Sequence, residues 1–253
     1  MDTLNIEQQN GYAIIQIDNG KVNAINTHLV RNLRDIFLDY AEKDEIRGIA
    51  LIGKPNCFSA GLDIMMMATS SLDEVLEFWR TYMEALQAMV RYPKPFICGI
   101  TGFAPAAATS IALCADYRIM SQGAKHVIGL NEFKMSLAIP EMMGDIYAYH
   151  LGEKTAWEAV QHARLFTAEE AITVGLVNEA VAAEEVVAKT EERMAKMLKI
   201  LPNTYAQSKR IMRKGLLQVV DRDISSLLQQ IRDQFEDPTT KQLFELFLAK
   251  LKK

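Results

Sequence analysis

The stretch CFSAGLDI, residues 57–64, places three small residues, Ser59, Ala60 and Gly61, between an apolar run and an acid. The apolar run, RGIALIG at 47–53, is rich in Ile and Leu and ends at a glycine, which is typical of a buried strand. Small residues at the end of such a strand allow bare backbone to approach a ligand closely. An isolated Ala-Gly pair is more often a plain turn. The rest of the chain therefore has to decide between a turn and a ligand-binding loop.

A second small-residue loop repeats this design further along the chain. The segment FICGI at 96–100 predicts another short buried strand, and TGFAPAAATSIALCADYRIM follows it at 101–120. In this segment we expect Gly102 to turn the chain and Pro105 to be the first residue of a helix. Two such loops side by side can donate two backbone N–H groups to one carbonyl oxygen, as in an oxyanion hole. Paired small-residue turns also occur in many other α/β folds, so the spacing alone does not prove this geometry.

The remaining periodicities predict an α/β protein with strand–loop–helix units first and an all-helical C-terminal third. Alternation and apolar stripes predict a strand and two helices, at 12–18, 27–40 and 72–91. From about residue 183 to the end we expect three helices, with interruptions near Pro202 and at 237–238. The apolar stripe in KQLFELFLAKL, at 241–251, predicts that the last of these helices packs against another surface.

Composition and charge exclude several classes of protein. Of the 253 residues, 49% are hydrophobic and 24% charged, which is ordinary for a globular protein, and the net charge is −4. Without a long basic run, nucleic acid is not expected as the main partner. The three separated cysteines, Cys57, Cys98 and Cys114, fit buried thiols in a reducing compartment. We find no signal or transit peptide and no apolar stretch of membrane-spanning length, and we predict a cytoplasmic protein without a membrane partner.

Three segments together resemble the crotonase (enoyl-CoA hydratase/isomerase) superfamily, and within it the mitochondrial-type Δ3,Δ2-enoyl-CoA isomerases. They are FSAGLDI at 58–64, ITGFAPAAATSIALCADYRIM at 100–120 and IGLNE at 128–132. The resemblance runs from about residue 22 to 181. It implies a crotonase-like (ClpP/crotonase) fold of repeated ββα units over 1–200, followed by a helical region, 201–253, that takes part in oligomer packing. It also implies a homotrimer or hexamer whose C-terminal helices cover a neighbour or their own active site.

The resemblance further implies an enzyme of fatty-acid β-oxidation type that acts on an acyl-CoA thioester, with no metal and no cofactor besides the substrate's own coenzyme A. The implied catalytic groups are the N–H groups of Leu62 and Ala107, which form the oxyanion hole, and the carboxylate of Glu132, which is the base. The implied substrate-binding residues are Val22, Ala24, Ala60, Gly61, Asp63, Ile64 and Asn131. We interpret the Asp63 side chain, like that of Asp116, as a structural hydrogen-bonding acid.

This sequence departs from the family pattern in the second loop, where Ala106, Ala107 and Ala108 stand in place of paired glycines. An alanine keeps its N–H, but at a position with φ > 0 it is strained by about 1–2 kcal/mol. Hydratases of the superfamily use two glutamates, and the first of these positions is Ser110 here. A single carboxylate suffices to shift a double bond from 3-enoyl-CoA to 2-trans-enoyl-CoA through a dienolate, so the pattern favours an isomerase.

Two other functions stay open at this point. A hydratase or another crotonase activity needs a second acid, such as Glu141 or Asp145. A non-catalytic acyl-CoA binder is compatible with the three alanines. A serine hydrolase is disfavoured, because Ser110 lacks a G-x-S-x-G elbow and is expected to pack in its helix instead of pairing with His126 or His150. The apolar residues Met65, Met66, Met67 and Phe133 are interpreted either as walls for an acyl chain or, for the methionines, as core.

Overall fold

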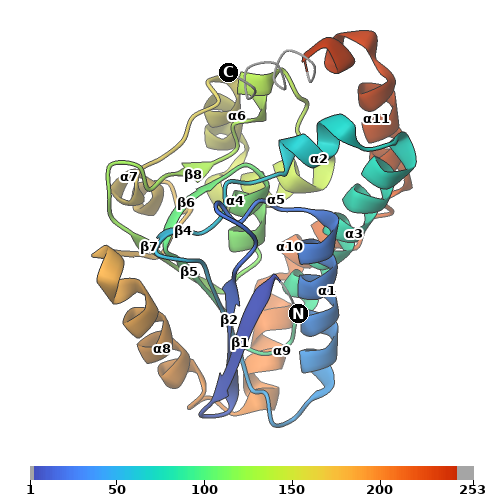
Figure 1. Ribbon diagram of the computed structural model, residues 1–253. Coiled ribbons are helices and arrows are strands. Elements are labelled where there is room, and N and C mark those ends of the chain that lie inside the picture. The colour runs from blue at the N-terminus through green and yellow to red at the C-terminus, as the bar shows by residue number, and fades with distance from the viewer. Residues whose placement is uncertain (1–2, 244–253) are drawn as a thin grey trace.

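The computed structural model describes residues 3–243, and two sheets organise this part of the chain (Figure 1). The larger sheet has six strands in the order β1-β2-β3-β5-β7-β9, of which β1 is antiparallel to β2 and the others run parallel. Its strands are β1 (Leu4–Gln9), β2 (Tyr12–Ile17), β3 (Ile49–Ile52), β5 (Phe96–Ile100), β7 (Tyr117–Ser121) and β9 (Glu179–Val181). The strands β3 and β5 are buried along their whole length, as expected for a parallel sheet that is covered on both faces.

Helices cover both faces of this sheet. Helix α8 (Val186–Met197) lies alone on one face, where Met194 packs against Ile14, Ile52 and Ile97. The opposite face carries the main core together with the packed pair α1 (Thr27–Glu42) and α3 (Leu72–Arg91). The other helices are α5 (Glu141–Leu151), α6 (Glu153–Gln161), α7 (Ala168–Thr173), α9 (Pro202–Met212), α10 (Lys214–Val220) and α11 (Ser225–Glu236), with a 3₁₀ turn η2 (Ala183–Glu185).

The smaller sheet is where the two predicted loops meet. It consists of the parallel strands β4 (Asn56–Cys57), β6 (Gly102–Pro105) and β8 (Ile128–Gly129). Each strand is followed by a loop and a short helical segment, and these segments are α2 (Ile64–Thr69), α4 (Ala107–Leu113) and the 3₁₀ turn η1 (Glu132–Met135). Because carboxyl ends of parallel strands meet at one edge of a sheet, all three loops open on the same side of the molecule.

Two sequence predictions are corrected by this arrangement. The segment expected to be a turn and a helix start, from Gly102 to Pro105, is strand β6, and the helix begins at Ala107. Four helices, α8 to α11, stand between 183 and 236, where the predicted breaks leave room for two of the three expected helices. One additional break is at Arg213, between α9 and α10, and the other follows α10, where the side-chain amide of Gln87 donates to the Val220 carbonyl oxygen at 2.8 Å. The break at Pro202 is confirmed, whereas most of the stripe at 241–251 lies outside the described residues.

A buried ionic cluster attaches α9 to the core. The carboxylate of Asp116 accepts hydrogen bonds from the Phe96 N–H and the Tyr205 hydroxyl, both at 2.9 Å. It also pairs with Lys209 at 2.7 Å and with Arg213 at 2.5 Å. Burial lowers the pKa of Lys209 to about 8, against the opposing attraction of the carboxylate. Asp116 is therefore a structural hydrogen-bonding acid, as predicted.

The cysteines agree with the sequence analysis. Cys57, Cys98 and Cys114 are free and buried. Within residues 3–243, no helix combines the length and the apolar character needed to cross a membrane.

Candidate functional site

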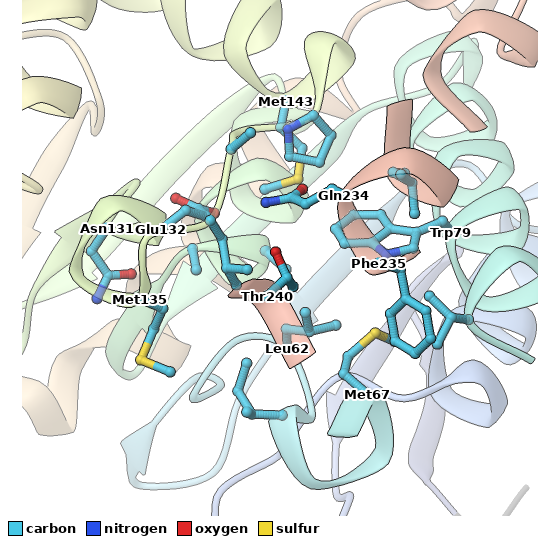
Figure 2. A pocket seen from close by; sticks show the side chains of 18 of the residues that line it. Leu62, Met67, Trp79, Asn131, Glu132, Met135, Met143, Gln234, Phe235 and Thr240 are labelled. Atoms are coloured by element: carbon cyan, nitrogen blue, oxygen red, sulfur yellow. The ribbon is translucent and has the colours of Figure 1, made fainter. Parts of the chain in front are cut away.

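A cavity of about 190 Å³ opens where the three loops of the smaller sheet meet the C-terminal helices. Most of its lining is apolar, and Figure 2 shows Glu132 and Asn131 at one side with Trp79 and Phe235 at the other. Five segments contribute, namely the loop after β4 together with α2, then α3, the β6–α4 turn, the segment from Asn131 to α5, and α11 with the residues after it. The lining residues are Ala60, Leu62, Ile64, Met67, Val75, Trp79, Pro105, Ala106, Ala107, Asn131, Glu132, Met135, Leu137, Ala138, Pro140, Met143, Ile231, Gln234, Phe235 and Thr240.

The first small-residue loop touches the second through Gly61. This glycine has φ +85°, and a Cβ there would lie 2.9 Å from the Pro105 carbonyl oxygen. A side chain at this position would therefore separate the two loops. The Ser59 hydroxyl holds the loop by donating to the Asn23 carbonyl at 2.6 Å and accepting from the Gly61 N–H at 3.1 Å. The small residues of the opening stretch are thus required for close packing of one loop on the other.

The N–H of Leu62 is left without an acceptor among the described residues. The neighbouring peptide groups bond to Ile25, whose N–H donates to the Gly61 carbonyl at 2.8 Å and whose carbonyl accepts from the Asp63 N–H at 3.0 Å. Because peptide groups alternate in direction along such a ladder, the Leu62 N–H points away from Ile25. Leu62 itself lines the cavity.

The second loop presents the N–H of Ala107. Ala106, just before it, has φ 54° and ψ −125°, a left-handed conformation that disfavours a side chain. Ala107 is the first residue of α4, so its N–H has no intrahelical acceptor, and no other described residue accepts from it. The strain that an alanine has at a position with φ > 0 therefore falls on Ala106 and not on the residue that presents the N–H.

Glu132 supplies a buried acid to the same cavity. Its Oε2 atom is inaccessible to solvent and has no hydrogen-bond partner among the described residues, although part of the residue remains exposed. Burial raises its pKa to about 7, while the backbone of Glu132 and Asn131 partly opposes the shift. A carboxyl group with a pKa near neutrality can both take and return a proton at physiological pH.

Comparison with known proteins agrees with this geometry. The model of the enoyl-CoA hydratase/isomerase family matches residues 7–252. This chain belongs to the enoyl-CoA hydratase/isomerase family. It is 30% identical over 244 residues to enoyl-CoA delta isomerase 1, mitochondrial, of Mus musculus, which covers 96% of this chain and 84% of that protein. It is also 31% identical over 182 residues to the probable enoyl-CoA hydratase EchA17 of Mycobacterium bovis, covering 71% of this chain and 68% of that protein.

Solved structures place the chain in the crotonase fold. The human mitochondrial delta3-delta2-enoyl-CoA isomerase superposes with a TM-score of 0.93 over 99% of this chain and 98% of that one, at 24% identity. An enoyl-CoA hydratase/isomerase family protein from Pseudomonas syringae superposes with a TM-score of 0.82 over 92% and 98%, at 28% identity. The fold class predicted from the sequence, a crotonase-like α/β fold with a helical C-terminal region, is thereby confirmed.

The structure brings most of the predicted site residues of this family member together. Ala60, Leu62, Ile64, Ala107, Asn131 and Glu132 all line the cavity, and Gly61 lies between two of them. Three others do not line it. The Val22 carbonyl accepts from the Ala60 N–H at 2.9 Å, and the Ala24 carbonyl accepts from the Asn19 amide at 2.6 Å. Asp63 caps α2 by accepting from the Met66 N–H at 2.9 Å, which is the structural role we expected of its side chain.

The second acids considered for a hydratase lie elsewhere. Glu141 and Asp145 face Arg222, which bonds to them at 3.1 and 2.5 Å. Among the described residues that line the cavity, Glu132 is the one acid. The arrangement considered for a serine hydrolase is also absent from residues 3–243, because His126 bonds to Ser121 at 2.8 Å and His150 to the Leu113 carbonyl at 2.9 Å.

Some predicted walls of the pocket are corrected. Phe133 is 42% exposed and makes an edge-to-face contact with Trp157 instead of lining the cavity. Of the three consecutive methionines, Met67 lines it, whereas Met65 is 47% exposed and Met66 packs beside the core. Neighbours along a helix turn point in different directions, so a run of three methionines cannot form one wall.

Sequence reasoning missed the far side of the cavity. Trp79 lies in the apolar stripe of the helix predicted at 72–91, which does not distinguish a cavity residue from a core residue, and nothing in the C-terminal third indicated Ile231, Gln234, Phe235 or Thr240. Helix α11 packs on α3, which brings these residues to the loops (Figures 1 and 2). Of the two positions expected for the C-terminal helices, α11 has the one over the chain's own site.

Proposed function

We propose that this chain is a Δ3,Δ2-enoyl-CoA isomerase that converts 3-enoyl-CoA to 2-trans-enoyl-CoA, as in fatty-acid β-oxidation. One observation carries the proposal: among the residues that the structure describes, Glu132 is the one carboxyl group in an apolar cavity, and it lies beside two N–H groups without acceptors. A hydratase shares the fold but works with a pair of acids, and the second acid is missing from the described lining. The relatives named as isomerases support this choice, and the relative named as a probable hydratase defines the alternative.

The proposed reaction moves one proton within the substrate. The Glu132 carboxylate takes a proton from C2 of the 3-enoyl thioester, and the electron pair of that C–H bond delocalises over the chain to the thioester oxygen. The N–H groups of Leu62 and Ala107 bind this oxygen as its negative charge grows, and they form the proposed oxyanion hole. Protonated Glu132 then delivers the proton to C4, which leaves a double bond between C2 and C3. No other reactant enters, so we propose that the reaction needs no cofactor beyond the coenzyme A of the substrate.

We propose a binding site in the cavity for both the thioester and the acyl chain of the substrate. We propose that the thioester lies between the backbone of 60–62 and 105–107, with Val22 and Ala24 beside the coenzyme A. The acyl chain would then extend past Glu132 toward Met143 and Trp79, where the lining is apolar. Burial of an apolar chain there contributes affinity, and the dry surroundings keep the Glu132 carboxyl group poorly solvated.

The test is one assay in which the pure protein is offered 3-enoyl-CoA and 2-enoyl-CoA. We expect formation of the conjugated thioester from the first and little hydration of the second. Glu132→Gln should keep substrate binding while turnover falls at least ~10²-fold. Hydration as the faster reaction would replace the isomerase with a hydratase. Binding of acyl-CoA with no proton exchange at C2 would leave a non-catalytic binder.

Assembly is a separate proposal. By analogy with the superfamily pattern we propose a trimer, alone or paired into a hexamer, to which residues 201–253 contribute packing surface. Ile211 and Met212, at the end of α9, are 67% and 77% exposed in the single chain and offer apolar surface for such contacts. A stable monomer in light scattering at micromolar concentration would contradict it.

A further inference from the structure

A buried threonine connects the two halves of the site. Thr109, on the first turn of α4, is 0% exposed, and its hydroxyl oxygen lies 2.6 Å from the Ala104 carbonyl oxygen of β6. The same oxygen lies 2.9 Å from the Gly129 nitrogen and 3.0 Å from the Gly129 carbonyl oxygen, both of β8. A hydroxyl has one proton and two lone pairs. Because its contact with the Ala104 carbonyl oxygen is the shortest, we infer that the Thr109 hydroxyl donates its proton there. The same hydroxyl oxygen accepts a hydrogen bond from the Gly129 N–H.

These bonds join the segments that carry the proposed chemistry. Two residues before Thr109 is Ala107, whose N–H is proposed to bind the thioester oxygen. Three residues after Gly129 is the proposed base, Glu132. The Ala106 N–H adds a parallel link, because it donates to the Gly129 carbonyl at 2.8 Å. The strands β6 and β8 are short and share few backbone hydrogen bonds. The hydrogen bonds of the Thr109 hydroxyl, here called the Thr109 bridge, therefore contribute much of the contact that fixes their register.

The surroundings leave little room for either segment to shift independently. Gly129 has φ +148°, and a Cβ there would lie 2.6 Å from the Arg164 carbonyl oxygen, so β8 is packed against the chain behind it. All seven residues of α4, Thr109 among them, are buried. The threonine hydroxyl therefore sits at a fixed point between the N–H donor and the acid.

We propose that Thr109 is a positioning residue that sets the separation between the Ala107 N–H and the Glu132 carboxylate. This inference rests on the proposed function, because the separation matters for catalysis only if the two groups act on one substrate. The hydrogen bonds of Thr109 are observed whether or not that function is correct. Proton transfer and charge stabilisation must occur in one substrate pose, and a displacement of about 1 Å can cost ~10²-fold in rate. Loss of the bridge should therefore reduce kcat more than it weakens substrate binding.

The test compares Thr109→Val, which keeps the shape and removes the hydroxyl, with Thr109→Ser, which keeps the hydroxyl. For Thr109→Val we expect kcat on 3-enoyl-CoA to fall at least ~10-fold while KM changes less than ~3-fold. Thr109→Ser should recover kcat to within about threefold of the wild type. If Thr109→Val does not fold, Thr109→Ala removes the same hydroxyl without adding a methyl group at its place, and it replaces valine in the comparison.

Thr101→Val is the matched control. Thr101 is 6% exposed, and its hydroxyl has no hydrogen-bond partner among the described residues, so its replacement removes a buried hydroxyl without breaking a bridge. We expect wild-type kcat and KM for this variant. Wild-type kcat in Thr109→Val, or an equal loss in Thr109→Val and Thr109→Ser, would overturn the proposal.

A second readout separates this proposal from the proposed function. Acetoacetyl-CoA forms an enolate whose negative charge is shared by its ketone and thioester oxygens, whereas butyryl-CoA has no such charge. Thr109→Val should weaken acetoacetyl-CoA binding at least ~10-fold and butyryl-CoA binding less than ~3-fold. If Thr109→Val loses acetoacetyl-CoA binding selectively but the wild type does not isomerise 3-enoyl-CoA, the proposed function fails and the role of Thr109 stands. If the wild type isomerises and Thr109→Val is unchanged in both assays, the role of Thr109 fails and the function stands.

Discussion

The hydroxyl of Tyr82 donates a 2.7 Å hydrogen bond to the carbonyl oxygen of Ala107. Tyr82 belongs to α3 and is fully buried, so this bond ties the first residue of α4 to a long helix of the core. The turn that presents the Ala107 N–H is therefore held from one side by α3 and from the other by the smaller sheet. Backbone donors that are held in this way need little reorganisation when charge develops on a bound oxygen.

Tyr82→Phe should therefore lower the free energy of unfolding by about 1 kcal/mol, because it removes this bond at nearly constant volume. For a chain of this size, such a loss corresponds to a fall in Tm of about 2–4 °C. Tyr92→Phe is the matched control, since the buried Tyr92 hydroxyl has no hydrogen-bond partner among the described residues. Thermal unfolding should show no loss for Tyr92→Phe, and an equal loss in both variants would contradict the role of the bond.

The pH dependence of turnover should report Glu132. The proposed base acts as the carboxylate, and burial raises its pKa to about 7. The value of kcat/KM should therefore be constant above this pH and fall about tenfold per pH unit below it. The measurement is a pH–rate profile on 3-enoyl-CoA from pH 5 to 9. A profile that stays flat down to pH 5 would exclude Glu132 as the titrating base.

The same shift predicts that Glu132 costs stability. Its pKa rises from 4.5 to about 7 on folding, so the native state keeps a proton that the unfolded chain has released between these values. Stability due to this group is present below pH 4.5 and is lost as the pH rises through 7. Glu132→Gln should thus be more stable than the wild type by about 2–3 kcal/mol at pH 8, with a difference of less than about 1 kcal/mol at pH 5. Urea unfolding of Glu132→Gln and the wild type at pH 5 and pH 8 measures the two differences. An equal gain in stability at both pH values would contradict the explanation by the raised pKa of Glu132.

Ala106 and Ala107 should respond in opposite directions to glycine. Ala106 has φ 54°, where a Cβ is disfavoured, so Ala106→Gly should stabilise the protein by about 1 kcal/mol. Ala107 has a helical position without such strain, so Ala107→Gly should destabilise it by up to about 1 kcal/mol. Thermal unfolding of the two variants is the test. A loss of stability in Ala106→Gly would show that the left-handed turn costs the chain little.

Asp116→Asn should unfold the C-terminal helices more easily. The substitution leaves Lys209 and Arg213 buried beside each other without their shared carboxylate. Removal of one partner from a buried ion pair typically costs about 3–5 kcal/mol. Asp18→Asn is the surface control, because its pair with Lys54 is exposed and should contribute less than about 1 kcal/mol. Equal losses in urea unfolding would show that the buried cluster contributes no more than a surface pair.

The sequence by itself determined the buried parallel strands and the loops that line one side of the cavity. The Ile- and Leu-rich runs at 47–53 and 96–100 form the buried strands β3 and β5, because a strand covered on both faces needs apolar residues at every position. The small residues of 57–64 and 101–108 lie beside the N–H groups of Leu62 and Ala107, which have no acceptor among the described residues, and the segment 128–132 contains Glu132. These features are local, since they depend on residue size, φ and hydrophobicity within a few positions.

Only the tertiary structure decided which residues close the cavity and how the acid behaves. Trp79 on α3 and Gln234 on α11 are more than 150 residues apart in the chain, and they meet because α11 packs on α3. The pKa of Glu132 depends on the apolar residues around it, which come from several distant segments. The positive φ of Ala106 is likewise a property of the folded loop, which packs against Gly61 of the neighbouring loop. Packing between segments has no short-range signal in the sequence, because it depends on the summed shape and burial of surfaces that form only in the folded chain.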